Sequence, residues 1–278
     1  MPLIVVPTPV GNMEDITLRA LRVLREADII ACEDTRRTKK ILGRYNIRTP
    51  LVSCHAFNEK ERAGILLERI VRGETVALVS DAGTPGISDP GFEMIRRARE
   101  ADLPIDVLPG ATALVPALLL SGFPPQPFFF EGFLPKRKGD RRRRIEYFRS
   151  LEGCVLLYLS PHGAESVIMD IIDILGDREC ALVREISKVF QESITGTLSS
   201  IHDRIRDGTA KGEMVLVLGP AAAVDDPSGA GWEVEADRLR DDGLTDREVV
   251  RKVSGEYGIA KNTVKRFLLS KERDKEVF

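Results

Sequence analysis

Short apolar runs alternate with helical patterns along the first 220 residues, and this alternation restricts the possible folds more than any other feature of the chain. The apolar runs are four to six residues long and rich in valine, isoleucine and leucine, as buried strands are. Strands are predicted at 3–6, 28–32, 50–53, 75–80 and 105–108, and helices at 15–27, 39–45, 59–72 and 92–101. This order favours an α/β fold with a mostly parallel sheet.

A break rich in proline and phenylalanine interrupts the alternation at 122–138. After the break, strands are predicted at 154–159, 180–183, 192–198 and 214–218, and helices at 163–175 and 199–207. The same pattern therefore runs twice along the chain. We expect two α/β domains of similar size, at 1–122 and 123–220.

The last part of the chain has a different composition. Residues 221–232 are small and acidic and include glycine and proline, which is typical of a flexible linker. Helical patterns follow at 233–240, 245–257 and 260–270, and the last two flank Gly258 in a helix-turn-helix outline. We expect a small helical domain at 233–278, which either packs as an add-on or contacts nucleic acid.

Composition excludes several classes of protein. The hydrophobic fraction of 43% is too high for a disordered chain. No apolar run reaches the ~18 residues of a membrane span, and the start lacks the basic region of a secretory signal. The cysteines at 32, 54, 154 and 180 are scattered, which is typical of reduced core thiols in a cytosolic protein. The three histidines form no zinc-ligand spacing with them, so no metal site is predicted.

Three loops rich in glycine and proline directly follow predicted strands, at 7–12, 80–86 and 109–113. In an open α/β sheet, ligands bind at the edge formed by the carboxyl ends of the parallel strands. Three such loops at one edge predict a ligand site. None of them has the GxGxxG pattern of a dinucleotide site, and no Walker A motif is present.

Eight segments in and beyond these loops stand out as motifs. They are PTPVGN, ACEDTRRT, SCHAFNEKER, VSDAGTPGISDPG, VLPGATALVPAL, EGFLPKRKGDR, VREISKVFQE and GEMVLVLGP. With these motifs the chain resembles the tetrapyrrole-methylase superfamily over nearly its whole length, and within it the branch that acts on ribosomal RNA. The resemblance implies two α/β domains with a cofactor cleft between them, a small C-terminal helical domain, and a homodimer.

The resemblance also implies an activity and a cofactor. The enzyme would use S-adenosylmethionine to methylate the ribose 2′-hydroxyl of a cytidine in the decoding region of small-subunit (16S) ribosomal RNA. Its partner would be this RNA or the assembled small ribosomal subunit, in the cytoplasm. Asp81 matches the family aspartate, and 109–113 matches the second cofactor loop. By the same matching, the predicted cofactor-binding residues are Val10, Asp81, Gly83, Thr84, Ile87, Thr112, Ala113, Ser160, Val183, Arg184 and Met214.

A positioned base would assist transfer of a methyl group to a ribose hydroxyl. The hydroxyl is a weak acid, and such a base contributes about 10²–10⁴-fold to the rate. Glu33, Asp34 and Arg36 are predicted to be catalytic or to position the RNA, because they follow a predicted strand at the ligand edge. A local ion pair that only orders the loop is the alternative for them. Other candidate bases are His55, Glu59, Glu185 and Lys188.

The formal net charge of −2 gives, for the chain as a whole, no sign of a nucleic-acid partner. The charge is uneven, however, because residues 136–144 hold seven positive side chains and one negative. Bound RNA needs its phosphates neutralised, and this run adjoins the predicted cleft. The predicted RNA-binding residues are Arg37, Lys136, Arg137, Lys138, Arg141, Arg142, Arg143 and Arg144. A solvated loop between the domains is the alternative for the run.

Two other functions stay open from the sequence. The same fold could methylate a tetrapyrrole, although such an enzyme would not need the basic run or the helical tail. A non-catalytic regulator that binds nucleic acid through the tail would have no affinity for S-adenosylmethionine. No membrane partner is expected.

Overall fold

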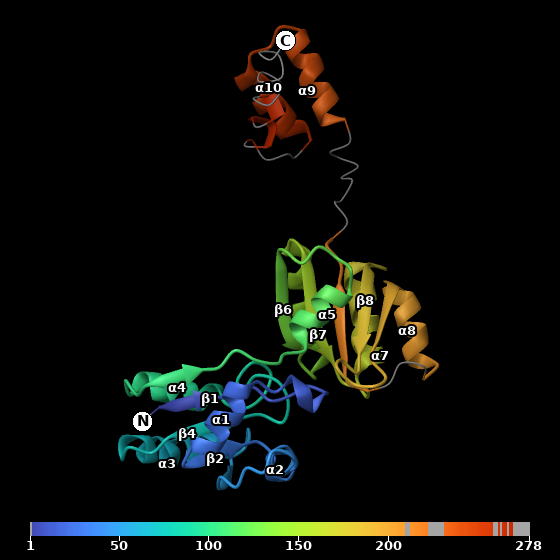
Figure 1. Cartoon of the computed structure of the whole chain (residues 1–278). Coiled ribbons are helices and arrows are strands. Elements are labelled where there is room, and N and C mark those ends of the chain that lie inside the picture. Colours follow the sequence, from blue (N-terminus) through green and yellow to red (C-terminus); the bar gives the residue numbers. More distant parts are fainter. Residues whose placement is uncertain are drawn as a thin grey trace. The chain divides into compact units, whose positions relative to one another are not determined.

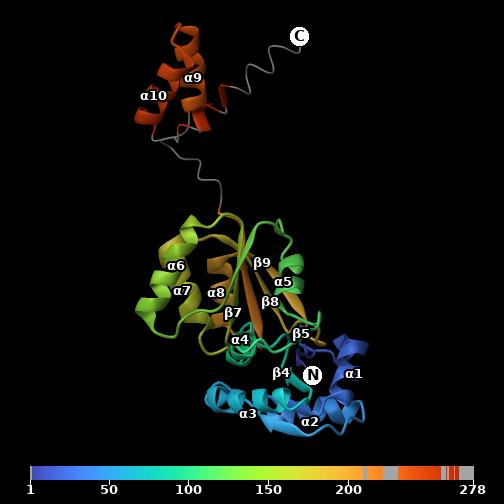
Figure 2. The same cartoon turned by 90° about the vertical axis from the view of Figure 1, so that its left-hand side faces the viewer.

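A computed structural model describes residues 2–208, 212–221, 231–257, 261, 263–265 and 267–268 (Figures 1 and 2). The chain divides into two compact units, Met1–Pro220 and Ala221–Phe278. The first unit contains two five-stranded sheets and eight α-helices in its described part. The predicted α/β fold is therefore confirmed.

The first sheet is entirely parallel. Its strands are β1 (Leu3–Val5), β2 (Ile29–Cys32), β3 (Leu51–Ser53), β4 (Val76–Val79) and β5 (Ile105–Val107), in the order β3-β2-β4-β1-β5. Every residue of β2 and β4 is buried, as their unbroken apolar sequences require when helices cover both faces of a sheet.

Helices cover the two faces of this sheet in pairs. One face packs against α1 (Leu18–Glu26) and α2 (Thr35–Arg44), and the other against α3 (Glu59–Val71) and α4 (Phe92–Glu100). The neighbouring strands β1 and β4 thus lead into helices on opposite faces. A crevice forms where two adjacent strands diverge in this way, at their carboxyl ends.

The helix predicted at 39–45 begins earlier, at Thr35, so that prediction was wrong at its start. Asp34 is the N-cap of α2, and its side chain accepts a hydrogen bond from the backbone N–H of Arg36 at 2.8 Å. An aspartate cap satisfies one of the N–H groups that a helix leaves free at its start. The ACEDTRRT motif is therefore a strand end followed by a capped helix.

The second sheet is mixed, in the order β6-β7-β10-β8-β9. Its strands are β6 (Phe128–Phe133), β7 (Cys154–Leu159), β8 (Glu179–Arg184), β9 (Glu192–Thr197) and β10 (Met214–Leu218). Only the β6–β7 pair is parallel, and the other three pairs are antiparallel. The break rich in proline and phenylalanine contains β6.

Figure 2 shows α6 (Lys138–Tyr147), α7 (Ala164–Leu175) and α8 (Leu198–Arg206) on one side of the second sheet and α5 (Leu114–Leu120) on the other. Helix α5 follows β5 of the first sheet in sequence, yet Ala117 and Leu118 pack into the core of the second. The predicted domain boundary at residue 122 stays a prediction. Helix α5 lies before that boundary in sequence but packs on the second sheet, so it links the two sheets.

The basic run is largely helical, so its interpretation as a loop was wrong. Arg141 and Arg142 on α6 both bind Asp170 on α7, with Nε–Oδ2 and Nη1–Oδ1 distances of 2.7 and 2.8 Å. The Asp170 side chain is 5% exposed and that of Arg141 is 11% exposed. This ion pair clamps α6 to α7 beneath the surface.

The next two arginines are also engaged. Arg144 Nε lies 2.7 Å from Glu131 Oε1, and its guanidinium lies over the rings of Phe129 and Tyr147. Arg143 pairs with Asp140 one helical turn away at 3.0 Å. Four of the seven positive side chains of this run thus pair with acidic side chains inside the unit. Lys136, Arg137 and Lys138 are exposed, as is Arg143 beside its partner Asp140.

The second unit is a small helical body. It contains α9 (Trp232–Asp241) and α10 (Asp246–Glu256), and α10 begins with a capping box between Thr245 and Glu248. Val264 is buried together with the apolar faces of these helices. The described residues of the predicted helix at 260–270 are helical, and the rest of it lies outside the described residues, as does most of the predicted linker.

Two further observations concern the sequence-based exclusions. All four cysteines are buried and free, as predicted. Within the described ranges, no helix is both long and apolar enough to cross a membrane.

The clamp between α6 and α7 gives a first prediction. We expect Asp170→Asn to lower the free energy of unfolding by about 3–5 kcal/mol, because it leaves Arg141 buried without its counter-charge. The control is Asp173→Asn, since Asp173 is 51% exposed and, among the described residues, pairs with Arg142 alone. It should cost less than about 1 kcal/mol. Urea unfolding followed by circular dichroism measures both, and equal small losses would show that the clamp does not stabilise the unit.

Candidate active site

A cavity of about 370 Å³ lies at the carboxyl ends of β1 and β4, closed on its other side by the second sheet. This size is within the range of small-molecule sites. Nine of the predicted cofactor-binding residues line it, namely Val10, Asp81, Gly83, Thr84, Ile87, Thr112, Ala113, Ser160 and Met214. The structure thus brings together residues that are up to about 200 positions apart in sequence.

The three predicted loops join at this edge through backbone hydrogen bonds. Thr8 and Gly83 exchange two of them, with N–O distances of 2.9 and 2.8 Å. The Thr8 hydroxyl donates to the carbonyl of Ser80 at 3.1 Å, and the Thr84 hydroxyl donates to that of Ala111 at 3.3 Å. These contacts hold the three loops as one rigid rim around the cavity.

Two glycines make this rim possible. Gly83 has a φ of +74°, a left-handed conformation that side chains rarely adopt. Gly11 passes so close to the loop after β8 that an added Cβ would lie 2.4 Å from the carbonyl oxygen of Ile186. The first loop therefore touches the loop after β8, which brings the two sheets together at the cavity.

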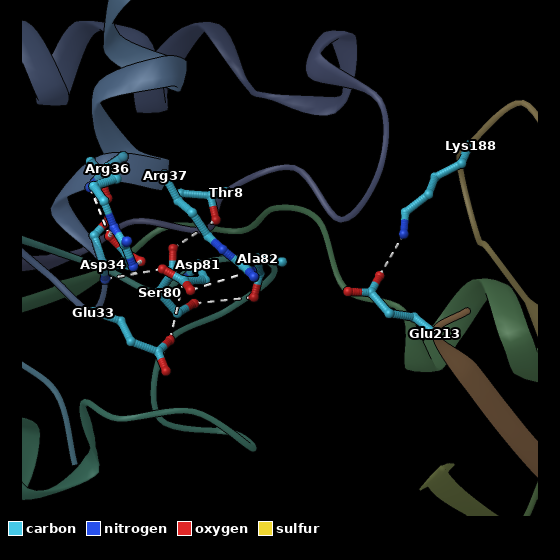
Figure 3. A network of polar contacts seen from close by, with 11 residues as sticks. Thr8, Glu33, Asp34, Arg36, Arg37, Ser80, Asp81, Ala82, Lys188 and Glu213 are labelled. Carbon is cyan, nitrogen blue, oxygen red and sulfur yellow. Dashed lines mark hydrogen bonds and ion pairs between the residues drawn. The ribbon is translucent and has the colours of Figure 1, made fainter. Parts of the chain in front are cut away.

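A network of carboxylates occupies the side of the cavity that the first sheet forms (Figure 3). The carboxylate of Asp81 accepts a hydrogen bond from the backbone N–H of Asp34 at 3.1 Å and pairs with Arg37 Nη1 at 3.3 Å. The backbone N–H of Asp81 in turn donates to Glu33 Oε2 at 3.4 Å. Glu33, Arg37 and Asp81 all line the cavity.

The other two predicted catalytic residues lie behind this network. Asp34 and Arg36 are not among the cavity residues, and they pair with each other at 2.7 Å. Hydrogen bonds from Arg36 hold the pKa of Asp34 at about 2. The pair caps α2 and fixes the backbone N–H that binds Asp81, so it contacts the cavity only through Asp81.

Asp89 is a cavity carboxylate that the sequence reasoning missed. It forms no hydrogen bond or ion pair with any residue of the described ranges. Burial raises its pKa to about 6, and the charges of Glu33 and Asp81 add to this rise. Burial, followed by the charge of Asp81, also raises the pKa of Glu33. Asp89 lies near the end of the VSDAGTPGISDPG motif, and this motif is the one sequence feature that could have indicated a role for Asp89 at the site.

The second sheet supplies the opposite wall. Tyr158, Ser160 and Met214 come from the ends of β7 and β10, and Phe133 comes from the end of β6. Figure 3 shows Glu213 on this side, held by Lys188 at 2.8 Å. The sequence reasoning selected only Ser160 and Met214 from this wall. It missed Phe133, Tyr158, Leu159, Pro161, Ile186, Glu213 and Val215, and on the first-domain side it missed Ala82 and Ser88.

Two predicted cofactor-binding residues do not line the cavity. Val183 is fully buried in the core between the second sheet and α5. Arg184 follows it on β8 and binds Glu192 across the strands at 2.6 Å. Both residues lie one strand away from Met214, with which Arg184 is in register.

The predicted RNA-binding residues fall into two groups. Arg37 lines the cavity, whereas none of the residues of the run at 136–144 does.

Among the other candidate bases, Glu59 accepts hydrogen bonds from two backbone N–H groups at the start of α4, at 2.9 and 3.2 Å. Glu185 pairs with Lys188 at 3.2 Å. These two carboxylates already have structural partners.

The cavity combines apolar walls with negative charge. Four carboxylates line it, from Glu33, Asp81, Asp89 and Glu213, against one arginine, Arg37. Across the described residues, no cluster of histidine, cysteine, aspartate or glutamate could hold a metal ion. Such a cavity fits an organic molecule that carries positive charge next to apolar groups.

Comparison with known proteins identifies the class. The family model "Tetrapyrrole (Corrin/Porphyrin) Methylases" matches residues 2–202, which include every predicted cofactor-binding residue except Met214. The match spans both sheets and the loops around the cavity.

Curated relatives narrow this class. "Ribosomal RNA small subunit methyltransferase I" of Halalkalibacterium halodurans is 38% identical over 267 residues, covering 94% of this chain and 92% of the relative. The protein of the same name from Thermotoga maritima is 42% identical over 216 residues, covering 78% of this chain and 97% of the relative. The chain belongs to the tetrapyrrole methylase family and, within it, to the group of these ribosomal RNA small subunit methyltransferases.

A solved structure agrees on the fold. Uroporphyrin-III C-methyltransferase from Thermus thermophilus, complexed with S-adenosyl homocysteine, superposes with a TM-score of 0.57 at 20% identity. The match covers 79% of this chain and 97% of that one.

Proposed function

We propose that the protein transfers a methyl group from S-adenosylmethionine to the ribose 2′-hydroxyl of a cytidine in the decoding region of small-subunit ribosomal RNA. The observation that carries the proposal is the cavity at the divergence of β1 and β4, acidic and apolar at once, in a chain of this methyltransferase group. The names of the relatives support ribosomal RNA as the substrate.

The cavity residues fit this cofactor. When bound, S-adenosylmethionine supplies an electrophilic methyl group on a positively charged sulfur. The carboxylates of Asp81 and its neighbours complement that charge and the charge of the amino group. The apolar side chains of Val10, Ile87 and Met214 offer surface for the adenosine, and the hydroxyls of Thr84, Thr112 and Ser160 can form hydrogen bonds to it.

A carboxylate of the cavity takes the proton of the ribose hydroxyl. Within the described part of the chain, Asp89 has no hydrogen-bond or ion-pair partner and Glu33 accepts a single hydrogen bond, from a backbone N–H. Both carboxylates can therefore turn to a substrate. The pKa values of both carboxylates are raised toward neutral pH. A carboxylate with a higher pKa is a stronger base, so both are better proton acceptors than an ordinary carboxylate. We assign the proton to Asp89, with Glu33 beside it. Asp34 and Arg36 position Glu33 through Asp81, which binds the backbone N–H of Asp34 and donates its own backbone N–H to Glu33.

Charge separates this function from the alternatives. Lys136, Arg137 and Lys138 are exposed on the approach to α6, which suits an RNA backbone better than a tetrapyrrole. A regulator acting only through the second unit would not need the cavity. The relative from Thermotoga maritima supports this, because 216 matched residues make up 97% of its length and leave no room for both units.

The main test is the position of the transferred methyl group. With labelled S-adenosylmethionine and unmethylated small ribosomal subunits, we expect label in one cytidine, recovered in a dinucleotide that resists alkali. A 2′-O-methyl group blocks alkaline cleavage at its own phosphodiester, whereas a methyl group on the base does not. Naked RNA and the assembled subunit are compared in parallel. Label in alkali-sensitive mononucleotides, or transfer to uroporphyrinogen instead, would overturn the proposal.

The pH dependence of the single-turnover rate tests the proton acceptor. The rate should fall as the pH drops through about 6, because protonated Asp89 cannot accept a proton. Asp89→Asn should lower the rate by about 10²–10⁴-fold and remove this limb. Glu33→Gln should shift the midpoint downward, since it removes a negative charge that raises the pKa of Asp89. Glu100→Gln, at the opposite end of α4, is the control. A full rate in Asp89→Asn would exclude Asp89.

The salt dependence of RNA binding tests the exposed part of the basic run. Changing Lys136, Arg137 and Lys138 to Gln should reduce the slope of log affinity against log salt by about 2, because each phosphate contact contributes ~0.7–0.9. The control changes Arg25, Arg72 and Arg99 to Gln. These end α1, α3 and α4, which run back from the cavity edge to the opposite edge of the sheet. Equal slopes in both triple variants would remove this segment from the interface.

A further inference from the structure

Phe133 is an exposed aromatic residue in the wall of the cavity. It is the last residue of β6, lines the cavity and is 55% exposed. Large aromatic side chains dominate protein cores and interfaces, so one that is held half open beside a cavity suggests a ligand contact.

A β-bulge determines where this ring lies. In β6, Phe130 pairs with Leu156 and Phe133 with Tyr158, with a register shift between Phe130 and Gly132. In a regular strand, residues three positions apart face opposite sides of the sheet. The extra residue of the bulge brings Phe133 to the side of Phe130 and Tyr158. Bulges re-aim side chains in this way next to active sites.

The ring of Phe133 is also held in place. It meets the Tyr158 ring edge-on, with 5.4 Å between centroids and 65° between planes. Tyr158 is fixed from behind by Phe130, at 5.1 Å and 70°. At the bulge, Gly132 has a φ of +73°, and an added Cβ there would lie 2.9 Å from the hydroxyl of Ser88, another cavity residue. A ring already ordered in this way loses little entropy when it binds a ligand.

Exposed cations follow the ring within five residues. Lys136, Arg137 and Lys138 are exposed, and no ion pair joins any of them to another residue in the described ranges. An aromatic face beside free positive charge is the combination that binds single-stranded nucleic acid, because bases stack on the ring while phosphates meet the cations.

We propose that Phe133 is the surface on which the base of the substrate nucleotide stacks. The inference rests on the proposed RNA methylation and adds the residue that holds the target base. With the base on Phe133 at the rim, the ribose lies at the mouth of the cavity and the flanking phosphates reach Lys136–Lys138. Burial raises the pKa of Tyr158, and the negative charge of nearby Asp89 raises it further. Asp89 therefore lies next to the ring that holds Phe133 and faces the same ribose.

The test compares four substitutions of Phe133 in the full chain. Phe133→Ala and Phe133→Leu should each raise the KM for RNA by about 5- to 150-fold, the range expected for one lost base stack. Phe133→Tyr and Phe133→Trp should keep it near the wild-type value. Leucine is the informative variant, because it retains an apolar side chain but no aromatic face. Phe128→Ala is the control, since Phe128 starts the same strand, is 43% exposed and does not line the cavity.

Two further measurements separate the possible outcomes. Calorimetry with S-adenosylmethionine should give the same affinity for wild type and all Phe133 variants. An RNA with a fluorescent cytidine analogue at the methylated position should be quenched on binding to wild type and to Phe133→Trp, but not to Phe133→Leu. A wild-type KM in Phe133→Leu, or a loss confined to cofactor affinity, would overturn the stacking role. If the wild-type protein itself transfers no methyl group to RNA, the proposed function fails instead.

Discussion

The parallel pairing of β1 with β4 is the constraint on which the rest of the first unit depends. The two strands lie side by side, but the chain leaves them toward opposite faces of the sheet, into α1 and α4. No helix can cover the point where they diverge, so a crevice is left at their carboxyl ends. The Thr8–Gly83 bridge joins two loops at the rim of this crevice, the loops that carry Val10 and Asp81. The cavity therefore follows from topology, before any particular side chain is considered.

The second sheet turns this crevice into an enclosed site. Helix α5 leaves the first sheet and buries Ala117 and Leu118 on the second, so the two sheets share a core segment. Gly11 allows the first loop to approach the carbonyl of Ile186 from the other side. With both contacts in place, the ends of β7 and β10 and the bulge of β6 face the carboxylates of the first domain. The residues that line the cavity thus come from both sheets of one compact unit.

The sequence predicted where the strands and the ligand-edge loops lie. It predicted less well which side chains line the cavity and which charged side chains pair with each other. Apolar runs such as the one that became β4 identify a buried strand without tertiary information, and glycine-rich loops after strands identify the ligand edge. Val183 and Arg184 were harder, because no residue of β8 lines the cavity, and the strand order that places the ends of β7 and β10 there cannot be deduced from a local pattern. Arg141 was taken for a free charge, since its partner Asp170 lies 29 residues away on another helix. Phe133 and Asp89 gain their positions from a bulge and a turn that no periodicity reveals.

The near-zero net charge now has a physical explanation. Negative charge gathers inside the cavity, from Glu33, Asp81 and Asp89, while exposed positive charge lies at the start of α6, at Lys136–Lys138. Under the proposed function these two fields serve opposite ligands, a cationic methyl donor inside and an anionic RNA outside. Methyl transfer converts the positively charged sulfur of the donor into a neutral thioether. The acidic cavity therefore loses part of its attraction for the cofactor once the reaction is complete, which favours exchange of spent cofactor for fresh donor. Under the same proposal, the carboxylates that attract the donor would repel RNA phosphates and so would keep the RNA backbone at the rim.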